Sequence, residues 1–210
     1  MRSRIKLSAF LQVGSALAAG GLLSVLFLFF PGPAPAGDCA ETVTIGKNDY
    51  AVPARWCGKR LDSTRIAVDT ELVRLPDEFT YEDYRIYLRP DARDAFVSMA
   101  RAAKGDSIQL LTDSGYRSLK FQERIILERL RGGQTIEHIL SMVAPAGYSE
   151  HHTGRAVDLV PSEALFAGTA GFTWLAEHAA GFGFRQTFPE SAADSLHWES
   201  WHWYYQPDSE

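Results

Sequence analysis

Hydrophobic residues recur with helical spacing from residue 90 onward. Between residues 91 and 103 the apolar positions lie three or four residues apart, at Ala92, Ala95, Phe96, Met99 and Ala103. This spacing predicts an amphipathic helix. Similar patterns predict helices over residues 118–131, 135–143 and 173–180. Two glycines follow the predicted helix over residues 118–131, and Gly181 follows the one over residues 173–180; glycine is a common residue at the end of a helix.

Short apolar or β-branched runs lie between these segments and predict strands. They occupy residues 42–45, 107–111, 156–160, 182–188 and 197–205. Helices and strands mix without a regular β-α-β-α alternation, which favours an α+β fold with an antiparallel sheet backed by helices.

The N-terminus has the pattern of an export signal. Arg2, Arg4 and Lys6 precede an uncharged apolar run over residues 7–30. A run of about 23 residues can span a bilayer, which favours an uncleaved signal anchor. The small residues 34–36 also fit the cleavage site of a signal peptide, so both readings stay open. Either way residues 1–36, with their Pro-rich spacer, place the rest in the periplasm or on the outer face of the bacterial cytoplasmic membrane.

Charge and cysteine content refine this picture. Three of the 21 Lys and Arg residues lie in residues 1–36, which leaves 18 against 26 Asp and Glu. The exported part is therefore acidic, which argues against a nucleic-acid partner.

Cys39 and Cys57 are the two cysteines, and in an exported protein such a pair favours a disulfide. Lipid attachment at Cys39 is the alternative, which Asp38 fits poorly. Residues 37–80 are too few for a core of their own and should pack on a main domain over residues 81–210.

Two polar groups near the C-terminal end could bind a metal. His151 and Asp158 are separated by seven positions and a glycine turn, so a loop and the following strand could bring them together. Glu199 and His202 add an imidazole and a carboxylate. Two nitrogens and one oxygen from the protein are typical of a catalytic zinc site with one open position. Taken singly, each group has a plainer explanation, a polar surface loop or a hydrogen-bonded pair on an edge strand.

Glu199 and His202 also predict a local backbone feature. Residues three apart on a regular strand point to opposite faces of the sheet. If both side chains belong to one site, the chain must bend or the strand must end between them.

A third polar group lies at a predicted turn before the second helix. Residues 114–118 read Ser-Gly-Tyr-Arg-Ser, and Gln122 follows one helical turn later. The Arg117 guanidinium and the Gln122 amide could bind a carboxylate or a developing oxyanion. A solvated arginine at a helix start is the plainer alternative.

In this order the three groups resemble the zinc D-alanyl-D-alanine carboxypeptidases over about residues 81–205. That family includes the carboxypeptidases and dipeptidases of vancomycin resistance and the related L,D-carboxypeptidases. The resemblance implies one zinc ion held by His151, Asp158 and His202. It also implies Glu199 as general base and Arg117 as the group that polarises the carbonyl.

The resemblance extends to substrate and fold. Ser149 and Gln122 stand at positions that help to bind the substrate in that family, and we assign Tyr116 and Ser118 to substrate binding with them. His152 stands at a variable position and is not expected to be a ligand. The implied fold is shared with the Hedgehog signalling domain, and the implied substrates are peptidoglycan stem peptides.

Several activities share such a metal site. Removal of the last D-alanine from a pentapeptide, a D,D-carboxypeptidase activity, ranks first, and L,D-carboxypeptidase activity on tetrapeptides ranks second. A peptidoglycan endopeptidase is a further alternative. A zinc-containing cell-wall binding module is the non-enzyme alternative, although such a module would need neither Glu199 nor Arg117.

Overall fold

The structure is a computed structural model that describes residues 39–189 and 198–207. The predicted export segment, residues 1–36, lies outside these residues. Within the described part, no helix combines the length and apolar character needed to cross a membrane.

The central element is a four-stranded antiparallel sheet. Its strands follow the order β5 (Thr112–Ser114), β6 (Ala156–Leu159), β8 (His202–Tyr205) and β7 (Phe184–Arg185). Two antiparallel hairpins accompany it. One pairs β1 (Thr42–Ile45) with β2 (Asn48–Ala51), and the other pairs β3 (Val73–Arg74) with β4 (Tyr87–Leu88).

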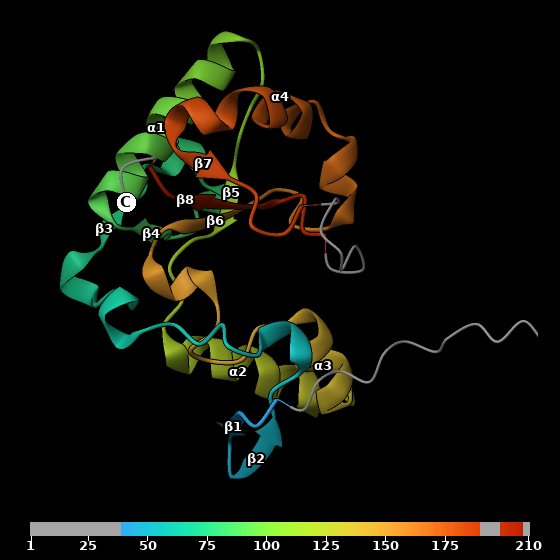
Figure 1. The fold of residues 1–210 in the computed structure, drawn as a ribbon. Coiled ribbons are helices and arrows are strands. Elements are labelled where there is room, and N and C mark those ends of the chain that lie inside the picture. The colour runs from blue at the N-terminus through green and yellow to red at the C-terminus, as the bar shows by residue number, and fades with distance from the viewer. Residues whose placement is uncertain (1–38, 190–197, 208–210) are drawn as a thin grey trace, which may run out of the picture. The chain divides into compact units, whose positions relative to one another are not determined.

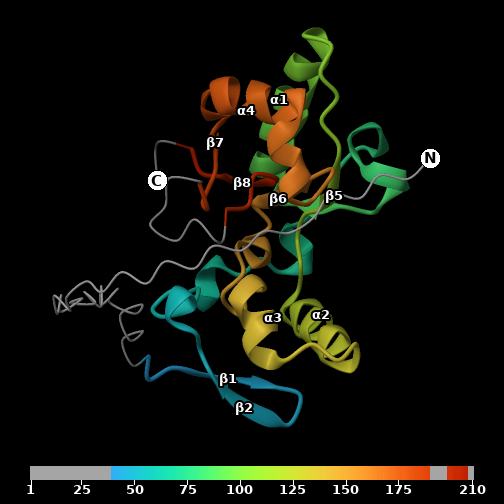
Figure 2. The same ribbon diagram turned by 90° about the vertical axis from the view of Figure 1, so that its right-hand side faces the viewer.

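Two helices pack with the sheet in a first hydrophobic cluster. α1 (Pro90–Gly105) and α4 (Ala170–His178) lie on the same side of the sheet in both views (Figures 1 and 2). The cluster joins Phe96 and Met99 of α1 to Val157 and Leu159 of β6. These four side chains are fully buried, so their removal from water stabilises this half of the fold. The predicted α+β architecture is confirmed.

The other two helices form a second hydrophobic cluster with the N-terminal hairpin. α2 (Leu119–Arg131) and α3 (Ile136–Met142) begin at capping residues, Ser118 and Thr135, whose hydroxyls accept hydrogen bonds from the first turn. Ile126 and Ile139 of these helices meet Val43 and Trp56 of the N-terminal segment. Figure 2 shows β1 and β2 beneath these helices, on the side away from the sheet.

A disulfide and a hydrogen bond hold the N-terminal segment in place. Cys39 and Cys57 form the predicted disulfide, with their Cα atoms 5.8 Å apart. The indole nitrogen of Trp56 donates a hydrogen bond to the carbonyl oxygen of Leu140 over 2.8 Å. The segment therefore contributes side chains to the second cluster.

Short 3-10 helices connect the longer elements. They are η1 (Ala54–Trp56), η2 (Ser63–Arg65), η3 (Asp69–Glu71), η4 (Asp77–Phe79), η5 (Tyr81–Asp83), η6 (Glu150–Thr153), η7 (Ala164–Gly168) and η8 (Ala179–Phe182).

The strand predicted over residues 107–111 is wrong in position, because the ladder begins at Thr112. The chain leaves α1 through Ser107, which has a positive φ of 63°. The amide of Ile108 then bonds to the carbonyl of Ala103 in α1, 2.8 Å away, rather than to a strand. Leu110 is buried in the first cluster. The apolar run therefore packs mainly into the core, and only Leu111 at its end accepts a bond from the segment after β6, from the amide of Val160 over 2.9 Å. The strand predicted over residues 182–188 is shorter in the structure, where only β7 (Phe184–Arg185) is paired.

Candidate metal centre and active site

Three buried side chains that bind metals well converge at one end of β6 and β8. Asp158 lies on β6 and pairs across the ladder with His202, the first residue of β8, while His151 lies on η6. His151 Nε2 is 3.1 Å from Asp158 Oδ2, and His202 Nδ1 is 2.9 Å from Asp158 Oδ1. One ligand atom from each of the three lies within 4.8 Å of the others. Two imidazole nitrogens and a carboxylate oxygen fit a zinc ion or a related divalent metal.

Two glycines make this convergence sterically feasible. Gly154 follows η6 with a left-handed φ of 68°, and a Cβ there would lie 2.9 Å from the Leu72 side chain. A Cβ on Gly115 would lie 2.8 Å from the carbonyl oxygen of Tyr87 and still closer to the side chain of Ile86. Glycine at these positions lets the loop that carries His151 and the turn after β5 approach their neighbours closely.

Each histidine has a second hydrogen-bond partner that fixes its orientation. His151 Nδ1 donates to the carbonyl oxygen of Gly115 over 2.6 Å, which leaves Nε2 to face Asp158. His202 Nε2 donates to Glu150 Oε2 over 3.0 Å, which leaves Nδ1 to face Asp158. A carbonyl or carboxylate behind a metal-binding histidine sets the tautomer and increases the basicity of the ligand.

Glu150 was not among the residues singled out from the sequence. Its signal was present, because it directly precedes His151, and metal-binding histidines commonly bond to a carboxylate. The sequence does not reveal that its partner is the distant His202 rather than its neighbour.

Burial and nearby charges set the protonation of these groups. Burial, with the Arg117 charge, lowers the pKa of His151 to about 4, so this ring is neutral near pH 7. Burial raises the pKa of Asp158, but His151 and Arg117 outweigh it and hold that pKa well below its usual value. Burial lowers the pKa of His202, but its bonds to Asp158 and Glu150 outweigh this and raise the pKa to about 10. His151 and Asp158 therefore already have the protonation state that metal binding requires.

Arg117 lies beside the carboxylate of Asp158. Its Nε donates to Ser114 Oγ over 2.7 Å, and its Nη2 donates to Asp158 Oδ2. Its backbone amide bonds to the carbonyl oxygen of His151 over 3.2 Å. Side chain and backbone together hold the guanidinium at the edge of the candidate metal centre.

Glu199 lies in the turn that precedes β8. The amide of His202 bonds to the carbonyl oxygen of Glu199 over 3.1 Å, so the strand begins only at His202. The predicted bend between the two residues is confirmed. Burial raises the pKa of Glu199 above its usual value. Its carboxyl group can therefore accept and return a proton closer to neutral pH than an exposed glutamate.

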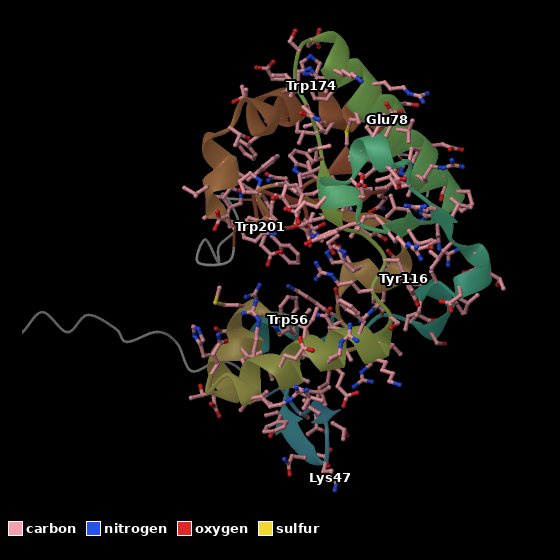
Figure 3. The ribbon with its side chains drawn as sticks, turned by 180° about the vertical axis from the view of Figure 1, so that it is seen from behind. Lys47, Trp56, Glu78, Tyr116, Trp174 and Trp201 are labelled. Carbon is pink, nitrogen blue, oxygen red and sulfur yellow. A yellow bond between two sulfur atoms is a disulfide. The ribbon has the colours of Figure 1, made fainter. Side chains whose placement is uncertain are left out.

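A cleft of about 440 Å³ contains all of these groups and lies between the two hydrophobic clusters. Asp158, His202 and Trp201 line it from the sheet side, and Trp56 and Ile125 line it from the side of the second cluster. In Figure 3 the labelled Trp201 and Trp56 lie across it from one another. Its volume suits a small ligand or a peptide end.

Two of the predicted substrate-binding residues line the cleft. Ser149 and Gln122 are both buried there. The Gln122 amide nitrogen donates to the carbonyl oxygen of Ala144 over 2.9 Å, while its Oε1 has no hydrogen-bond partner among the described residues. An unpaired buried carbonyl is costly, so this atom is suited to accept a hydrogen bond from a ligand.

The other two predicted substrate-binding residues do not line this cleft. Ser118 caps α2 through a bond from the amide of Phe121. The backbone amide of Tyr116 bonds to the carbonyl oxygen of Tyr87 over 2.8 Å. Their role in substrate binding stays a prediction.

His152 is fully buried but is not part of the metal group. Its Nε2 accepts from the amide of Gly147 over 3.1 Å, and its Nδ1 donates to the carbonyl of Arg117 over 2.6 Å. It therefore ties two site loops together, and both ring nitrogens are engaged.

Comparison with known proteins identifies the family. The family model described as VanY, D-alanyl-D-alanine carboxypeptidase, matches residues 85–208, more than half of the chain. The chain belongs to this family. A relative from Enterococcus faecium, a D-alanyl-D-alanine carboxypeptidase, is 27% identical over 153 residues, which cover 71% of this chain and 46% of that relative. The chain spans about half the length of the curated relatives it matches.

Solved structures support the same assignment. The LD-carboxypeptidase LdcB is 30% identical, with a TM-score of 0.59 over 67% of this chain and 70% of that chain. VanYB, solved in complex with D-alanine-D-alanine, is 26% identical, with a TM-score of 0.50 over 66% of this chain and 78% of that chain. The predicted family and its D,D-peptidase-type fold are confirmed.

Proposed function

We propose that this protein is a zinc-dependent carboxypeptidase that removes the C-terminal D-alanine from peptidoglycan stem peptides. One observation carries the proposal. His151, Asp158 and His202 converge in the same cleft as Glu199 and Arg117, in a chain that belongs to the D-alanyl-D-alanine carboxypeptidase family. We propose one zinc ion at this group. Zinc in such a site acts as a Lewis acid that polarises the carbonyl group to be cleaved.

The chain's own residues have distinct roles in this proposal. The Glu199 carboxylate accepts a proton from the water that attacks the carbonyl carbon. Arg117 stabilises the negative charge that develops on the carbonyl oxygen, because its guanidinium is held in place by Ser114 and Asp158. Glu199 then returns the proton to the departing amine as the carbon–nitrogen bond breaks. Ser149 and Gln122 bind the peptide within the cleft, where the free Gln122 Oε1 accepts a peptide N–H.

The preferred bond is proposed as D-alanyl-D-alanine, because the family model carries that description. L,D-carboxypeptidase activity is the second candidate, favoured by the similarity to LdcB, whose TM-score is 0.59. The two activities differ in the residue that precedes the released D-alanine.

Mass spectrometry of muropeptides after incubation with the zinc-loaded protein tests both candidates. Loss of one D-alanine from a pentapeptide supports the first activity, and loss from a tetrapeptide alone supports the second. Binding of muropeptides without hydrolysis would overturn both and leave a cell-wall binding module. Glu199→Gln is the matched control, because it keeps the shape of the side chain but removes the base.

We further propose that residues 1–36 export the domain and hold it at the membrane when uncleaved. The apolar run over residues 7–30 supports this proposal. Fractionation of cells that produce the full chain and a chain lacking residues 1–36 tests it. Recovery of both forms in the cytoplasm would contradict it.

A further inference from the structure

A second cavity, of about 560 Å³, is lined by polar side chains and contains four arginines. The arginines are Arg65, Arg89, Arg155 and Arg185, and the wall beside them is formed by Thr64, Thr153, Tyr204 and Gln206. No acidic residue lines this hollow among the residues that the structure describes. The gathering of four cations is unexpected in a chain whose formal net charge is −5. We call this cavity the arginine hollow.

The arginine hollow is separate from the catalytic cleft. The two cavities share no lining residue. Asp158 and His202 form one register pair of β6 and β8, whereas Ala156 and Tyr204 form another, two residues further along the strands. Tyr204 lines the hollow, so the hollow lies toward the end of these strands that is remote from the candidate metal ligands.

Two of the four guanidinium groups form ion pairs with carboxylates. Arg89 pairs with Glu71 over 2.9 Å and also donates from Nε to the carbonyl oxygen of Thr153 over 3.0 Å. Arg155 pairs with Asp91 over 2.9 Å. These contacts hold both side chains in place at the wall of the hollow, and the two carboxylates offset two of the four positive charges.

The other two guanidinium groups bond to neutral atoms. Arg65 Nη2 donates to the hydroxyl of Tyr204 over 3.4 Å, and Arg185 Nη2 donates to Gln206 Oε1. Both arginines are exposed. A guanidinium carries five N–H donors, so each keeps further donors for a ligand. Like charges repel, and a bound anion would remove that cost.

We propose that the arginine hollow binds an oxyanion, a phosphate or carboxylate group of a larger molecule. Arg65 and Arg185 supply the contacts to the ligand, and Arg89 and Arg155 supply positive charge behind them. Guanidinium is suited to this task because its planar fork donates two parallel hydrogen bonds to a carboxylate or a phosphate. The proposal does not depend on the peptidase function proposed above.

Titration of the zinc-loaded full-length protein, followed by NMR of the arginine Nε–H groups, tests the proposal. The probes are inorganic phosphate and citrate, with sodium chloride at matched ionic strength as the blank. We expect saturable shifts of the Arg65 and Arg185 signals with at least one of the two anions. Saturation by phosphate alone identifies a phosphate site, and saturation by citrate alone identifies a carboxylate site.

Variants separate the arginine hollow from other cationic surfaces. The double variant Arg65→Ala/Arg185→Ala should weaken binding of the preferred anion at least tenfold. Arg101→Ala, which removes an exposed arginine on α1, should leave the affinity unchanged. Arg65→Lys/Arg185→Lys keeps the charge but not the fork, and should weaken binding less than the alanine pair. Melting temperatures of all variants report whether the fold is retained.

Two results would overturn the proposal. One is a shift that never saturates and equals that of the chloride blank. The other is wild-type affinity in a folded Arg65→Ala/Arg185→Ala variant, including the case in which only the Arg117 signal responds and the anion occupies the catalytic cleft.

Discussion

Replacement of Glu150 by alanine removes the carboxylate behind the candidate ligand His202. In the structure His202 Nε2 donates to Glu150 Oε2 over 3.0 Å, while Nδ1 faces Asp158. Without Glu150, the His202 ring loses the hydrogen bond at Nε2 that favours the tautomer with Nδ1 available to a metal. The expected effect is weaker metal binding in a protein that still folds.

The size of the effect follows from the surroundings of this hydrogen bond. Loss of a partner behind a metal-binding histidine costs about 10–100-fold in metal affinity. At about 1.4 kcal/mol per tenfold, this corresponds to roughly 1.4–2.8 kcal/mol. The side chains of His202 and Glu150 are 4% and 19% exposed, so water replaces the lost acceptor poorly. We therefore expect Glu150→Ala to weaken zinc binding by close to 100-fold, the upper end of this range. Glu150→Gln should lie near tenfold, because a neutral acceptor forms about half as strong a bond.

Competition with a chromogenic chelator measures the zinc affinity of each variant directly. Glu128→Ala is the matched control, because it removes an exposed glutamate of α2 that pairs with Arg124 away from the metal group. Thermal unfolding in excess zinc checks that each variant is folded. Wild-type zinc affinity in a folded Glu150→Ala variant would refute the reasoning, since the His202 ring would then need no partner.

Four further predictions test other parts of the structure. Glu199→Gln should lower kcat by about 10²–10⁴-fold with zinc still bound, measured by peptide hydrolysis and metal analysis; near-wild-type turnover would remove Glu199 from the mechanism. Burial raises the pKa of Glu199, and the base must be ionised, so kcat/KM should fall with decreasing pH at a midpoint above 4.5; a midpoint at or below that value would contradict this. Gly115→Ala places a methyl group 2.8 Å from the carbonyl oxygen of Tyr87 and should destabilise the fold by about 1–3 kcal/mol in urea unfolding, whereas unchanged stability would mean that the turn relaxes freely. Cys39→Ser/Cys57→Ser opens a loop with a sequence separation of 18 and should cost about 3 kcal/mol in the same assay; the reduced wild-type protein should match it.

The sequence predicted the elements whose signals are local. α1 and α2 follow from apolar residues at helical spacing, and Ser118 marks the start of α2 through its own hydroxyl. The candidate ligands follow from the side-chain types that bind metals and from their order in the chain.

Features that depend on distant partners could not be read from the sequence in this way. The apolar run over residues 107–111 has the composition of a strand, but Leu110 packs into the first hydrophobic cluster, whose members come from distant segments. The pairing of Glu150 with His202 joins residues 52 positions apart. The arginine hollow likewise collects residues from five separate segments, none of which has a distinctive motif of its own.

The cleft between the two hydrophobic clusters takes its candidate metal ligands from one packing unit and part of its apolar wall from the other. Asp158 and His202 extend from strands of the first cluster, whereas Trp56 and Val143 reach the cleft from the second. Trp56 precedes the segment matched by the family model, residues 85–208. Mutations in the second cluster can therefore reshape the wall that a peptide contacts without disturbing the metal group. In such an arrangement the wall that a ligand contacts can change while the candidate metal ligands stay in place.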